Sequence, residues 1–455
     1  MTYSMYWLSS LDERLPKYQA IYKVIASAIS SGQLKVGDKL PPRRALALKL
    51  AVTVDTITRA FEELKKRNLI VSRVGDGTYV RERNEFAEPA LLVDLSQNHP
   101  SVLYEDALLA DTLKQMARDR GNLAGLLGYQ DDTGYVAHQL SLIKWLNQRG
   151  LNIKPGQLAV TSGAQQALYL TLRAILRPGD SLMAEQYTYP ILNVMAGQMR
   201  LQLLALPIDQ EGLIPREIER VMSFTDSRVL YCQPTCHNPT TAIMGEARRQ
   251  EIASLACRHD FLVIENITQA MFMEKQPQTI FELIPERTVL LGSFSKLTSP
   301  GLRVGFVAAE SHWGARISAW LRLLCWMPSL LPVEVIARWI ENGEMEKLLT
   351  AKNQDLAERH RVAQKHLGHF QYQTNPWANH LWLNLPFNWD AQNLGAALFS
   401  EHLTIKGAEA FTVGRTPVPR ALRLSLGTPR TIADLDRALG VASRIFSAGS
   451  QSGFS

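Results

Sequence analysis

Lys296 is the residue of this sequence best suited to covalent chemistry. It ends the segment Ser293-Phe294-Ser295-Lys296, which closes a short apolar run of the kind that forms a buried strand. An amine in such a place can form a Schiff base with the aldehyde of a cofactor. A lysine beside serines is more often an ordinary surface residue, so its role depends on the groups that accompany it.

Two sets of residues could bind the phosphate of such a cofactor. Ser162, Gly163 and Ala164 open a predicted helix, where exposed backbone N–H groups and the helix dipole favour an anion. Ser293 and Arg303 lie close to Lys296 in the sequence, and a guanidinium makes strong contacts with phosphate oxygens.

Three further residues suit the rest of a cofactor and its ligand. Tyr189 could stack on a planar ring, and Asn238, in the triplet His237-Asn238-Pro239, could donate to a ring oxygen. Arg423 lies on a late apolar run and suits a two-point contact with a carboxylate. Taken alone, each of these signals is weak.

The elements that must position these residues alternate between apolar runs and helical patterns. The runs cover 158–161, 181–185, 201–206, 228–232, 261–265, 288–293 and 304–308, and the helical patterns cover 164–176, 190–199, 215–222 and 245–259. Runs buried on both faces and separated by crossover helices predict a mostly parallel α/β sheet. A smaller α+β part should follow, with helices near 343–368 and a strand at 422–425.

Taken in chain order, these features resemble the fold-type I pyridoxal-phosphate aminotransferases over about residues 93–445. The resemblance rests on the helix-opening triplet, Tyr189, the HNP triplet, the SFSK segment and the later PGLRVG segment. It implies an α/β aminotransferase-like domain with a C-terminal α+β part, and pyridoxal 5'-phosphate bound as a Schiff base to Lys296. Arg423 is then assigned to the carboxylate of an effector.

Asn266 departs from the aminotransferase pattern. Those enzymes hold the pyridine nitrogen protonated with an Asp after the fifth strand, and here Asn266 stands at that position, with Thr268 or Gln269 in place of a Tyr. A neutral amide does not stabilise a protonated nitrogen as a carboxylate does, so the ring becomes a poorer electron sink. Glu265 is expected to face the other side of the strand. We therefore assign no catalytic residue and expect little or no transamination.

The first 83 residues differ from the rest in charge and pattern. They hold 15 Lys and Arg against 8 Asp and Glu, a formal charge of +7, whereas the whole chain carries +6. A basic head on a near-neutral body points to a polyanionic partner for the head. The sequence predicts helices at 17–31, after Pro41-Pro42 and at about 53–67, then strands at 70–73 and 78–80, the order of a winged helix-turn-helix. A small helical protein-binding module is the alternative.

The segments LPPRR, TVDTITRAFEEL and GDGTYV of this head resemble the GntR-type regulators. The resemblance implies double-stranded operator DNA as the partner, with the third helix in the major groove and the wing against phosphates. Val54 stands where the family often has Arg, so the operator sequence cannot be carried over. The residues expected to contact DNA are Arg44, Thr53, Asp55, Thr56, Arg59, Arg73, Gly75 and Gly77.

Head and body together resemble a MocR-type transcriptional regulator. The expected domains are a winged helix-turn-helix over 12–82, a linker over 83–95 and an aminotransferase-like domain over 96–445, divided into a large part near 125–330 and a small part near 340–445. The resemblance also implies a head-to-tail homodimer, in which Tyr129 reaches the phosphate bound by the partner subunit.

We expect a DNA-binding regulator whose body binds pyridoxal phosphate, an amino-acid-like effector, or both. Two alternatives stay open: an active aminotransferase with an attached DNA-binding head, and a direct sensor of pyridoxal phosphate that controls vitamin B6 genes. Footprinting with and without pyridoxal phosphate would separate the sensor from the other two.

The amino-acid composition excludes several other classes of protein. Of the 455 residues, 46% are apolar and 20% are charged, which excludes a disordered or fibrous chain. No apolar signal segment or membrane span is evident, so we expect a cytoplasmic protein. Cys232, Cys236 and His237 lack an evident fourth ligand, so no metal site is expected.

Overall fold

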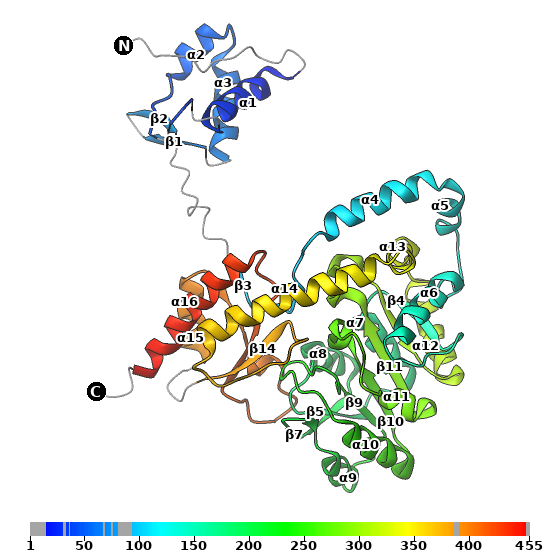
Figure 1. Ribbon diagram of the computed structural model, residues 1–455. Coiled ribbons are helices and arrows are strands. Elements are labelled where there is room, and N and C mark those ends of the chain that lie inside the picture. Colours follow the sequence, from blue (N-terminus) through cyan, green and yellow to red (C-terminus); the bar gives the residue numbers. More distant parts are fainter. Residues whose placement is uncertain are drawn as a thin grey trace. The chain divides into compact units, whose positions relative to one another are not determined.

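The chain folds into two compact units, one up to residue 91 and the other from residue 92 (Figure 1). The computed structural model describes residues 15–30, 33–35, 37–66, 69–73, 76–80, 93–385 and 391–451. We call the described residues up to 80 the head and those from 93 the body. The expected head boundaries at residues 12 and 82 and most of the expected linker lie outside the described residues.

The described part of the head has the predicted order of elements. These are α1 (Lys17–Ser30), α2 (Arg43–Lys49), α3 (Val54–Lys66), β1 (Ile70–Arg73) and β2 (Gly77–Val80). Helix α3 buries Ile57, Ala60, Phe61 and Leu64, which recur at helical spacing. Strands β1 and β2 pair antiparallel, and their ends Ile70 and Val80 close the same core. The head therefore has a hydrophobic core of its own.

The body is built on a seven-stranded sheet in the order β4-β12-β11-β10-β9-β5-β6. All seven apolar runs form its strands, which are β4 (Leu158–Thr161), β5 (Ser181–Glu185), β6 (Gln202–Leu206), β9 (Val229–Cys232), β10 (Leu262–Asn266), β11 (Thr288–Ser293) and β12 (Gly305–Ala308). Only β12 runs against its neighbours β4 and β11, so the other six strands share one direction. The prediction of a mostly parallel sheet is confirmed.

Helices cover both faces of this sheet, as its continuous apolar strands require. Strand β10 illustrates the arrangement, because Ile264 packs in a cluster with α7 (Ala164–Ile175) and α12 (Ser311–Cys325), whereas Val263 packs in another with α9 (Pro215–Met222) and α10 (Glu246–His259). Successive residues of one strand thus face opposite layers, which decides where the polar residues at its end point.

The remaining elements of the large part complete these layers. They are α4 (Glu105–Arg118), α5 (Arg120–Leu126), α6 (Val136–Gln148), α8 (Pro190–Met199), α11 (Ile280–Leu283), α13 (Leu330–Glu341), the short strands β7 (Ile208–Asp209) and β8 (Gly212–Leu213), and the 3-10 turns η1 (Thr268–Phe272), η2 (Pro285–Arg287), η3 (Phe294–Lys296) and η4 (Pro300–Leu302).

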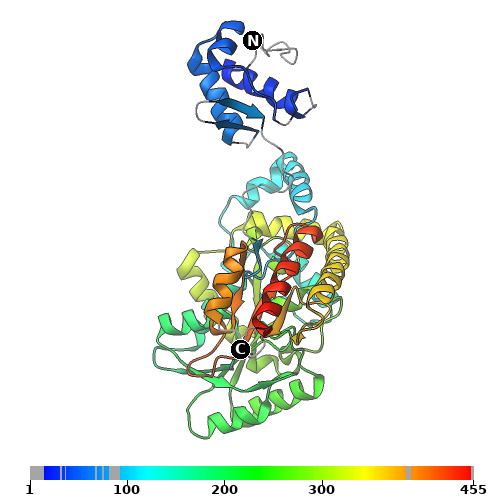
Figure 2. The ribbon, with the colours of Figure 1, turned by 90° about the vertical axis from the view of Figure 1, so that its left-hand side faces the viewer.

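The small part of the body is a four-stranded antiparallel sheet in the order β13-β14-β17-β16. Its elements are β13 (Tyr372–Gln373), β14 (His380–Asn384), β16 (Lys406–Gly407), β17 (Ala421–Ser425), η5 (Ala408–Ala410), α14 (Glu344–Leu367), α15 (Ala391–Ser400) and α16 (Ile432–Gln451). Figure 2 shows α16 between α15 and α14. The predicted strand at 422–425 and helix at 343–368 are both found here.

The end of the expected linker is part of this small part. Strand β3 (Val93–Asp94) pairs in parallel with β15 (Leu403–Thr404), and Leu95 is fully buried in the small part's core. The linker therefore cannot extend to residue 95. A strand of two residues has no periodicity of its own, and its partner lies some 310 residues further along the chain.

Helix α14 belongs to both parts of the body. Met345 and Leu348 near its start pack in the core of the large part, whereas Ala363 and Leu367 near its end pack in the core of the small part. No helix among the described residues is long and apolar enough to cross a membrane. The described residues also hold no cluster of three His, Cys, Asp or Glu side chains placed to bind a metal ion.

Candidate functional site

A cavity of about 380 Å³ lies where the parallel strands of the large sheet end. Of the residues singled out from the sequence, Ala164, Tyr189, Asn238, Asn266, Lys296 and Arg423 line it. Four of the first five follow β4, β5, β9 and β11, Asn266 ends β10, and Arg423 comes from β17 of the small part. Residues far apart in the chain meet here because the carboxyl ends of parallel strands share one edge.

Lys296 reaches the cavity on a tight turn directly after β11. Ser293 fixes that turn, because its hydroxyl accepts from the Ser295 N–H at 3.2 Å and donates to the Val304 carbonyl at 3.0 Å. Ser293 is buried and does not line the cavity. The hydroxyl thus positions the turn that carries Lys296, and its expected contact with the cofactor phosphate stays a prediction.

The amine of Lys296 is enclosed by protein, although part of the side chain borders the cavity. It donates to the backbone carbonyl of Asn98. Removal from bulk water, together with repulsion by Arg423 and Arg303, lowers the pKa of Lys296 to about 7. A large share of this amine is thus uncharged at neutral pH, which is the form that attacks an aldehyde.

The loop from Ser162 to Ala164 forms an anion-binding corner with Arg303. Gly163 has a φ of 86°, and Arg303 Nη2 donates to the Ser162 carbonyl at 3.3 Å. A Cβ atom on Gly163 would lie 2.6 Å from that Nη2, and one on Gly305 would lie 2.6 Å from Gly163. The close approach requires glycine at both places. The guanidinium and the N–H groups that open α7 can then face one phosphate.

Arg303 comes to this corner because β12 is antiparallel. It lies two residues before Gly305, the first residue of β12, which pairs with Ser293 at the end of β11 and with Thr161 at the end of β4. Arg303, Ser162 and Gly163 lie next to the cavity and do not line it.

Arg423 is a buried cation without a carboxylate partner among the described residues. Its Nη1 donates to Asn238 Oδ1 at 2.9 Å, and its Nη2 donates to the Ser96 carbonyl at 2.5 Å. Its Nε is buried and has no partner in the described part of the chain. Burial lowers the pKa of Arg423 to about 10, so an incoming anion would stabilise its charge. Asn238 uses its oxygen to hold Arg423 and keeps only its Nδ2 group as a donor.

Asn266 is held so that it can only donate toward the cavity. Its Oδ1 accepts from the Thr268 N–H at 3.0 Å, which fixes the orientation of the amide. Its Nδ2 donates to the hydroxyl of Tyr231 on the neighbouring strand β9 at 2.9 Å. One Nδ2 hydrogen is left, and it suits a ring nitrogen that carries no proton.

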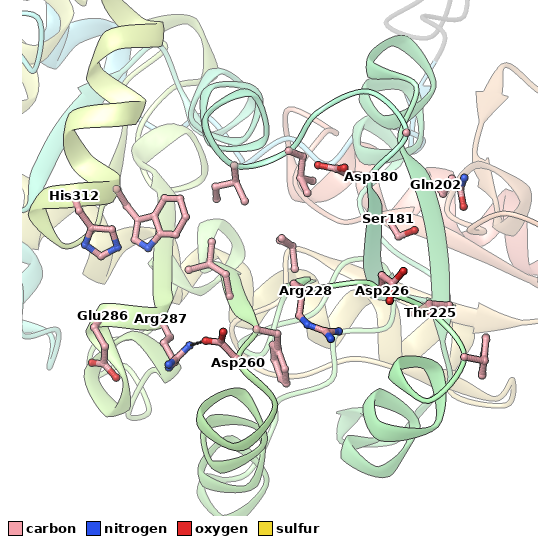
Figure 3. Close-up of a pocket in the computed structure, with 18 residues that line it drawn as sticks. Asp180, Ser181, Gln202, Thr225, Asp226, Arg228, Asp260, Glu286, Arg287 and His312 are labelled. Carbon is pink, nitrogen blue, oxygen red and sulfur yellow. Dashed lines mark hydrogen bonds and ion pairs between the residues drawn. The ribbon is translucent and has the colours of Figure 1, made fainter.

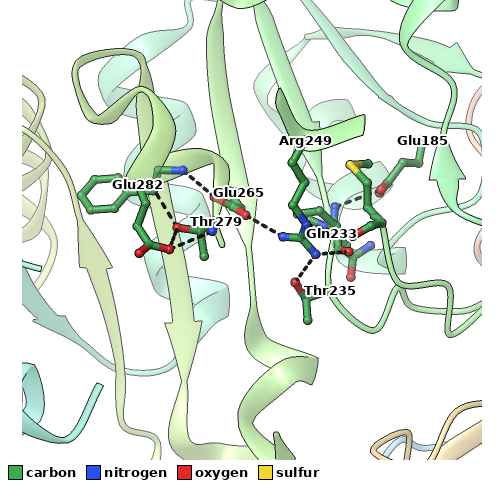
Figure 4. A network of polar contacts seen from close by, with 10 residues as sticks. Glu185, Gln233, Thr235, Arg249, Glu265, Thr279 and Glu282 are labelled. Atoms are coloured by element: carbon green, nitrogen blue, oxygen red, sulfur yellow. Dashed lines mark hydrogen bonds and ion pairs between the residues drawn. The ribbon is translucent and has the colours of Figure 1, made fainter. Parts of the chain in front are cut away.

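Glu265 points away from the cavity, as the alternation along β10 predicts. It is fully buried, 3.6 Å from Arg249 of α10, and it accepts from the backbone N–H of Phe281 at 2.9 Å (Figure 4). Burial raises the pKa of Glu265 to about 7 despite the nearby guanidinium. Glu265 therefore cannot take the place of the missing Asp.

Several cavity residues were missed by the sequence reasoning. Asn98 donates to the Gln269 side chain at 3.2 Å, and Lys406 lies on β16. The signal for the first of these is the polar SQNH segment directly after the buried Leu95, where the expected domain begins and no site was predicted. Nothing local marks Lys406. The missed residues are Ser96, Gln97, Asn98, His99, Pro190, Ile191, Gln233 and Lys406.

A larger cavity, of about 910 Å³, lies at the opposite ends of the strands (Figure 3). It is lined by Ser181, Gln202 and Arg228 at the starts of β5, β6 and β9, and an ion pair between Asp260 and Arg287 lies in its wall. None of the residues singled out for chemistry reaches it. Ligands of open α/β sheets bind at the carboxyl ends of the strands, so the smaller cavity is the candidate site.

In the head, the start of α3 presents a polar surface. Thr53, Asp55 and Arg59 are exposed there, and Arg44 is exposed on α2. Thr53 caps the helix, because its hydroxyl accepts from the Thr56 N–H at 3.3 Å. The exposed face is the one that a helix-turn-helix inserts into the major groove.

The wing, the hairpin of β1 and β2, is held at its turn by Lys39, a residue that was not predicted from the sequence. Lys39 pairs with Asp76 at 2.9 Å, and a Cβ atom on Gly77 would lie 2.6 Å from the Lys39 side chain. Gly77 has a φ of 142°, which favours glycine. Arg73 lies opposite Gly77 in the hairpin. The side chain of Arg73 and the whole of Gly75 lie outside the described residues.

Tyr129 does not line the cavity of its own chain. Its side chain is 82% exposed and makes an edge-to-face contact with Trp326, with 5.8 Å between ring centroids. Leu127, Leu323 and Leu324 are also exposed. A role toward a partner subunit stays a prediction.

Comparison with known proteins agrees with this division of the chain. Residues 91–440 match the model of aminotransferase class I and II, and residues 17–80 match that of the bacterial regulatory proteins of the gntR family. The HTH-type transcriptional regulator YdeF of Bacillus subtilis, described as uncharacterized, is 26% identical, with 97% of each chain covered.

Two further likenesses cover about three quarters of this chain. The HTH-type pyridoxine biosynthesis transcriptional regulator PdxR of Corynebacterium glutamicum is 26% identical over 76% of this chain and 77% of its own. The alpha-aminoadipate aminotransferase LysN of Thermus thermophilus, solved with N-(5'-phosphopyridoxyl)-L-leucine, superposes with a TM-score of 0.71 at 20% identity, covering 79% of this chain and 93% of its own. The second likeness shows the fold alone.

Proposed function

The chain belongs to the aminotransferase class I and II family and carries a gntR-family DNA-binding domain, as MocR-type transcriptional regulators do, and from this premise we propose that its body binds pyridoxal phosphate and an amino-acid effector with little or no transaminase turnover. The observation that carries the proposal is Asn266, which lines the cavity where the family's enzymes have a carboxylate.

The residues around the cavity fit pyridoxal phosphate. The uncharged amine of Lys296 would hold its aldehyde, the corner of Arg303 and residues 162–164 its phosphate, and Tyr189 the face of its ring. When bound, this cofactor supplies an electron sink for reactions at the α-carbon of an amino acid. Asn266 leaves the ring nitrogen unprotonated, which weakens that sink. Arg423 would hold the carboxylate of the amino acid.

The segment from residue 93 to 99 offers a route from the cavity toward the head. The Ser96 carbonyl accepts from Arg423, and the Asn98 carbonyl accepts from Lys296. A ligand that binds the side chains of Arg423 and Lys296 would compete with the carbonyls of Ser96 and Asn98 for them. These carbonyls belong to the first described segment that follows the head in the sequence. Ligand and operator affinities would then be linked reciprocally.

A homodimer follows from the same family and finds support in the exposed apolar residues around Tyr129 and Trp326. Contiguous exposed apolar surface on a folded domain commonly marks an interface. We propose that this surface contacts a second copy of the chain and that Tyr129 reaches the partner's phosphate corner.

A direct sensor of pyridoxal phosphate is the second candidate. It is favoured by Asn266, because a site without the carboxylate would hold the cofactor reversibly, and the name of the relative PdxR points to the same vitamin. In that case the cofactor itself changes DNA binding, without an amino acid.

Binding to a duplex from upstream of the chain's own gene, followed by fluorescence anisotropy, tests the proposal. We expect salt-dependent binding that Arg59→Ala weakens about tenfold, because a contact of this kind contributes roughly 1–3 kcal/mol. An amino acid should change the affinity of the cofactor-loaded protein, and Arg423→Met should abolish that response. Arg258→Met, which removes an exposed guanidinium elsewhere, is the matched control.

Three outcomes distinguish the candidates. A response to pyridoxal phosphate alone supports the direct sensor, and a response that also needs an amino acid supports the leading proposal. Brisk keto-acid production from amino acids by the purified chain would overturn both in favour of an enzyme.

A further inference from the structure

Lys406 is a second unpaired cation of the cavity, and we infer that it binds an acidic group on the effector's side chain. The effector is then an amino acid with an anionic side chain. This inference rests on the proposed function, since it names the chemical class of the ligand for the same cavity.

The sheet register places Lys406 beside Arg423. Lys406 on β16 pairs directly with Arg423 on β17 in an antiparallel ladder. Residues directly opposite each other in such a ladder project to the same face, with Cβ atoms about 5 Å apart. Both side chains line the cavity. Two cations on neighbouring strands therefore face one ligand.

The lining of the cavity carries positive charge without a matching carboxylate. Lys406 and Arg423 line it beside Lys296, whose amine is only partly charged at neutral pH, and no Asp or Glu residue is among the lining residues. The side chain of Lys406 forms no hydrogen bond or ion pair with any residue that the structure describes. The Nε of Arg423 is buried and likewise unpartnered there. A buried cation such as Arg423 is normally paired, and Lys406 beside it is half-buried, so the ligand is the source of the missing anions.

The other groups of a loaded site leave Lys406 free. The phosphate corner uses Arg303 and residues 162–164, the cofactor aldehyde uses Lys296, and the α-carboxylate uses Arg423. Lys406 is then the one cation of the lining that neither the cofactor nor the α-carboxylate engages. A side-chain carboxylate can pair with it, whereas an amide of the same shape leaves the ammonium partly desolvated without a counter-charge.

Pairs of amino acids that differ only in this charge test the inference. We would load the full chain with pyridoxal phosphate and titrate it with L-glutamate, L-glutamine, L-aspartate and L-asparagine by calorimetry. One of the two acids should bind at least tenfold more tightly than its amide. Lys406→Met should bring that ratio close to one, and Lys406→Arg should keep it. Lys154→Met, an exposed lysine outside the cavity, should also keep it.

A second measurement needs no variant. The preference for the acid should shrink as salt is raised from 0.05 to 0.5 M, about a threefold shorter screening length, because an ion pair at a partly exposed lysine is screened. Equal binding of acid and amide by the unchanged protein, or a preference that survives Lys406→Met, would overturn the inference.

The proposed function fails in a different way. Suppose that neutral amino acids bind with an affinity that depends on Arg423, and that acidic ones bind no more tightly. In that case the proposed function is upheld and the role given to Lys406 is wrong. If none of the four amino acids binds at millimolar concentration, both statements are wrong, and pyridoxal phosphate remains as the candidate effector.

Discussion

At the scale of single residues, Lys296 and Asn266 set what the cavity can do. The first offers an amine that is largely uncharged from neutral pH upward, and the second offers only a hydrogen-bond donor where a carboxylate would be needed for efficient transamination. The site thus combines the means to hold an aldehyde with poor means to use it. This combination suits recognition better than turnover.

The lowered pKa of Lys296 predicts an unusual pH profile for cofactor capture. Because that pKa is about 7, the rate of covalent capture of pyridoxal phosphate should rise through a midpoint near pH 7 and then level off. An ordinary lysine would show its midpoint near pH 10. The growth of visible absorbance after mixing, measured from pH 6 to 10, gives this midpoint.

Arg423 supplies the control for this profile. It is the largest cause of the lowered pKa after burial, so Arg423→Met should raise the pKa of Lys296 and move the midpoint to higher pH. Arg258→Met should leave the midpoint in place. A midpoint above pH 9 in the unchanged protein would show that the amine is not perturbed as described.

Asn266→Asp should strengthen both cofactor binding and chemistry. A carboxylate stabilises a protonated ring nitrogen, so we expect at least tenfold tighter binding of pyridoxal phosphate and measurable amino-group exchange with an amino acid. Absorbance titration gives the first quantity and keto-acid formation the second. Asn353→Asp, on α14 and outside the cavity, is the matched control. An Asp variant that matches the unchanged protein in both would contradict the role given to Asn266.

At the scale of elements, the buried pair of Glu265 and Arg249 joins β10 to α10. Glu265 has a folded pKa of about 7, above its ordinary value of 4.5. The folded protein therefore binds more protons than the unfolded chain between these values. The stability that Glu265 contributes is fully present below about pH 4.5 and is lost as pH rises through about 7.

Glu265→Gln should remove this pH dependence. Relative to the variant, the unchanged protein should lose about 1–3 kcal/mol of unfolding free energy between pH 5 and 8, given 1.36 kcal/mol per pKa unit. Urea unfolding at the two pH values measures the difference. Glu251→Gln, which changes an exposed residue of α10, should show no such change. A constant difference across this range would contradict the burial argument.

The strands were predictable because each is a continuous apolar run bounded by polar residues. Runs such as 158–161 and 288–293 appear in the structure with the same bounds. The residues that follow them could be named for the same reason. Lys406 and the segment 96–99 could not, because their place depends on pairing between β16 and β17 and between β3 and β15, which local sequence does not encode. The wing partner Lys39 was missed for the same reason.

At the scale of the whole molecule, head and body have separate hydrophobic cores. We therefore expect two unfolding transitions. Phe61→Ala, which truncates a buried side chain of α3, should lower the stability of the head by about 3–5 kcal/mol and leave the body's transition in place. Calorimetry resolves the two transitions.

The reciprocal variant identifies which transition is which. Phe281→Ala truncates a buried residue of the large part, so it should lower only the other transition. If either variant moved both transitions together, head and body would unfold as one cooperative unit.

Helix α14 links the two parts of the body mechanically, because it packs in the cores of both. Its 24 residues span about 36 Å, and its two ends are rooted in different cores. If a ligand bound Lys296 on one side and Arg423 on the other and drew those cores together, a tilt of α14 by only about 3° would move its far end by about 2 Å. Val93, the first described residue after the head, packs against the core at that far end. On the proposed function, the binding of a small metabolite would therefore displace the body by about 2 Å where its first described strand begins.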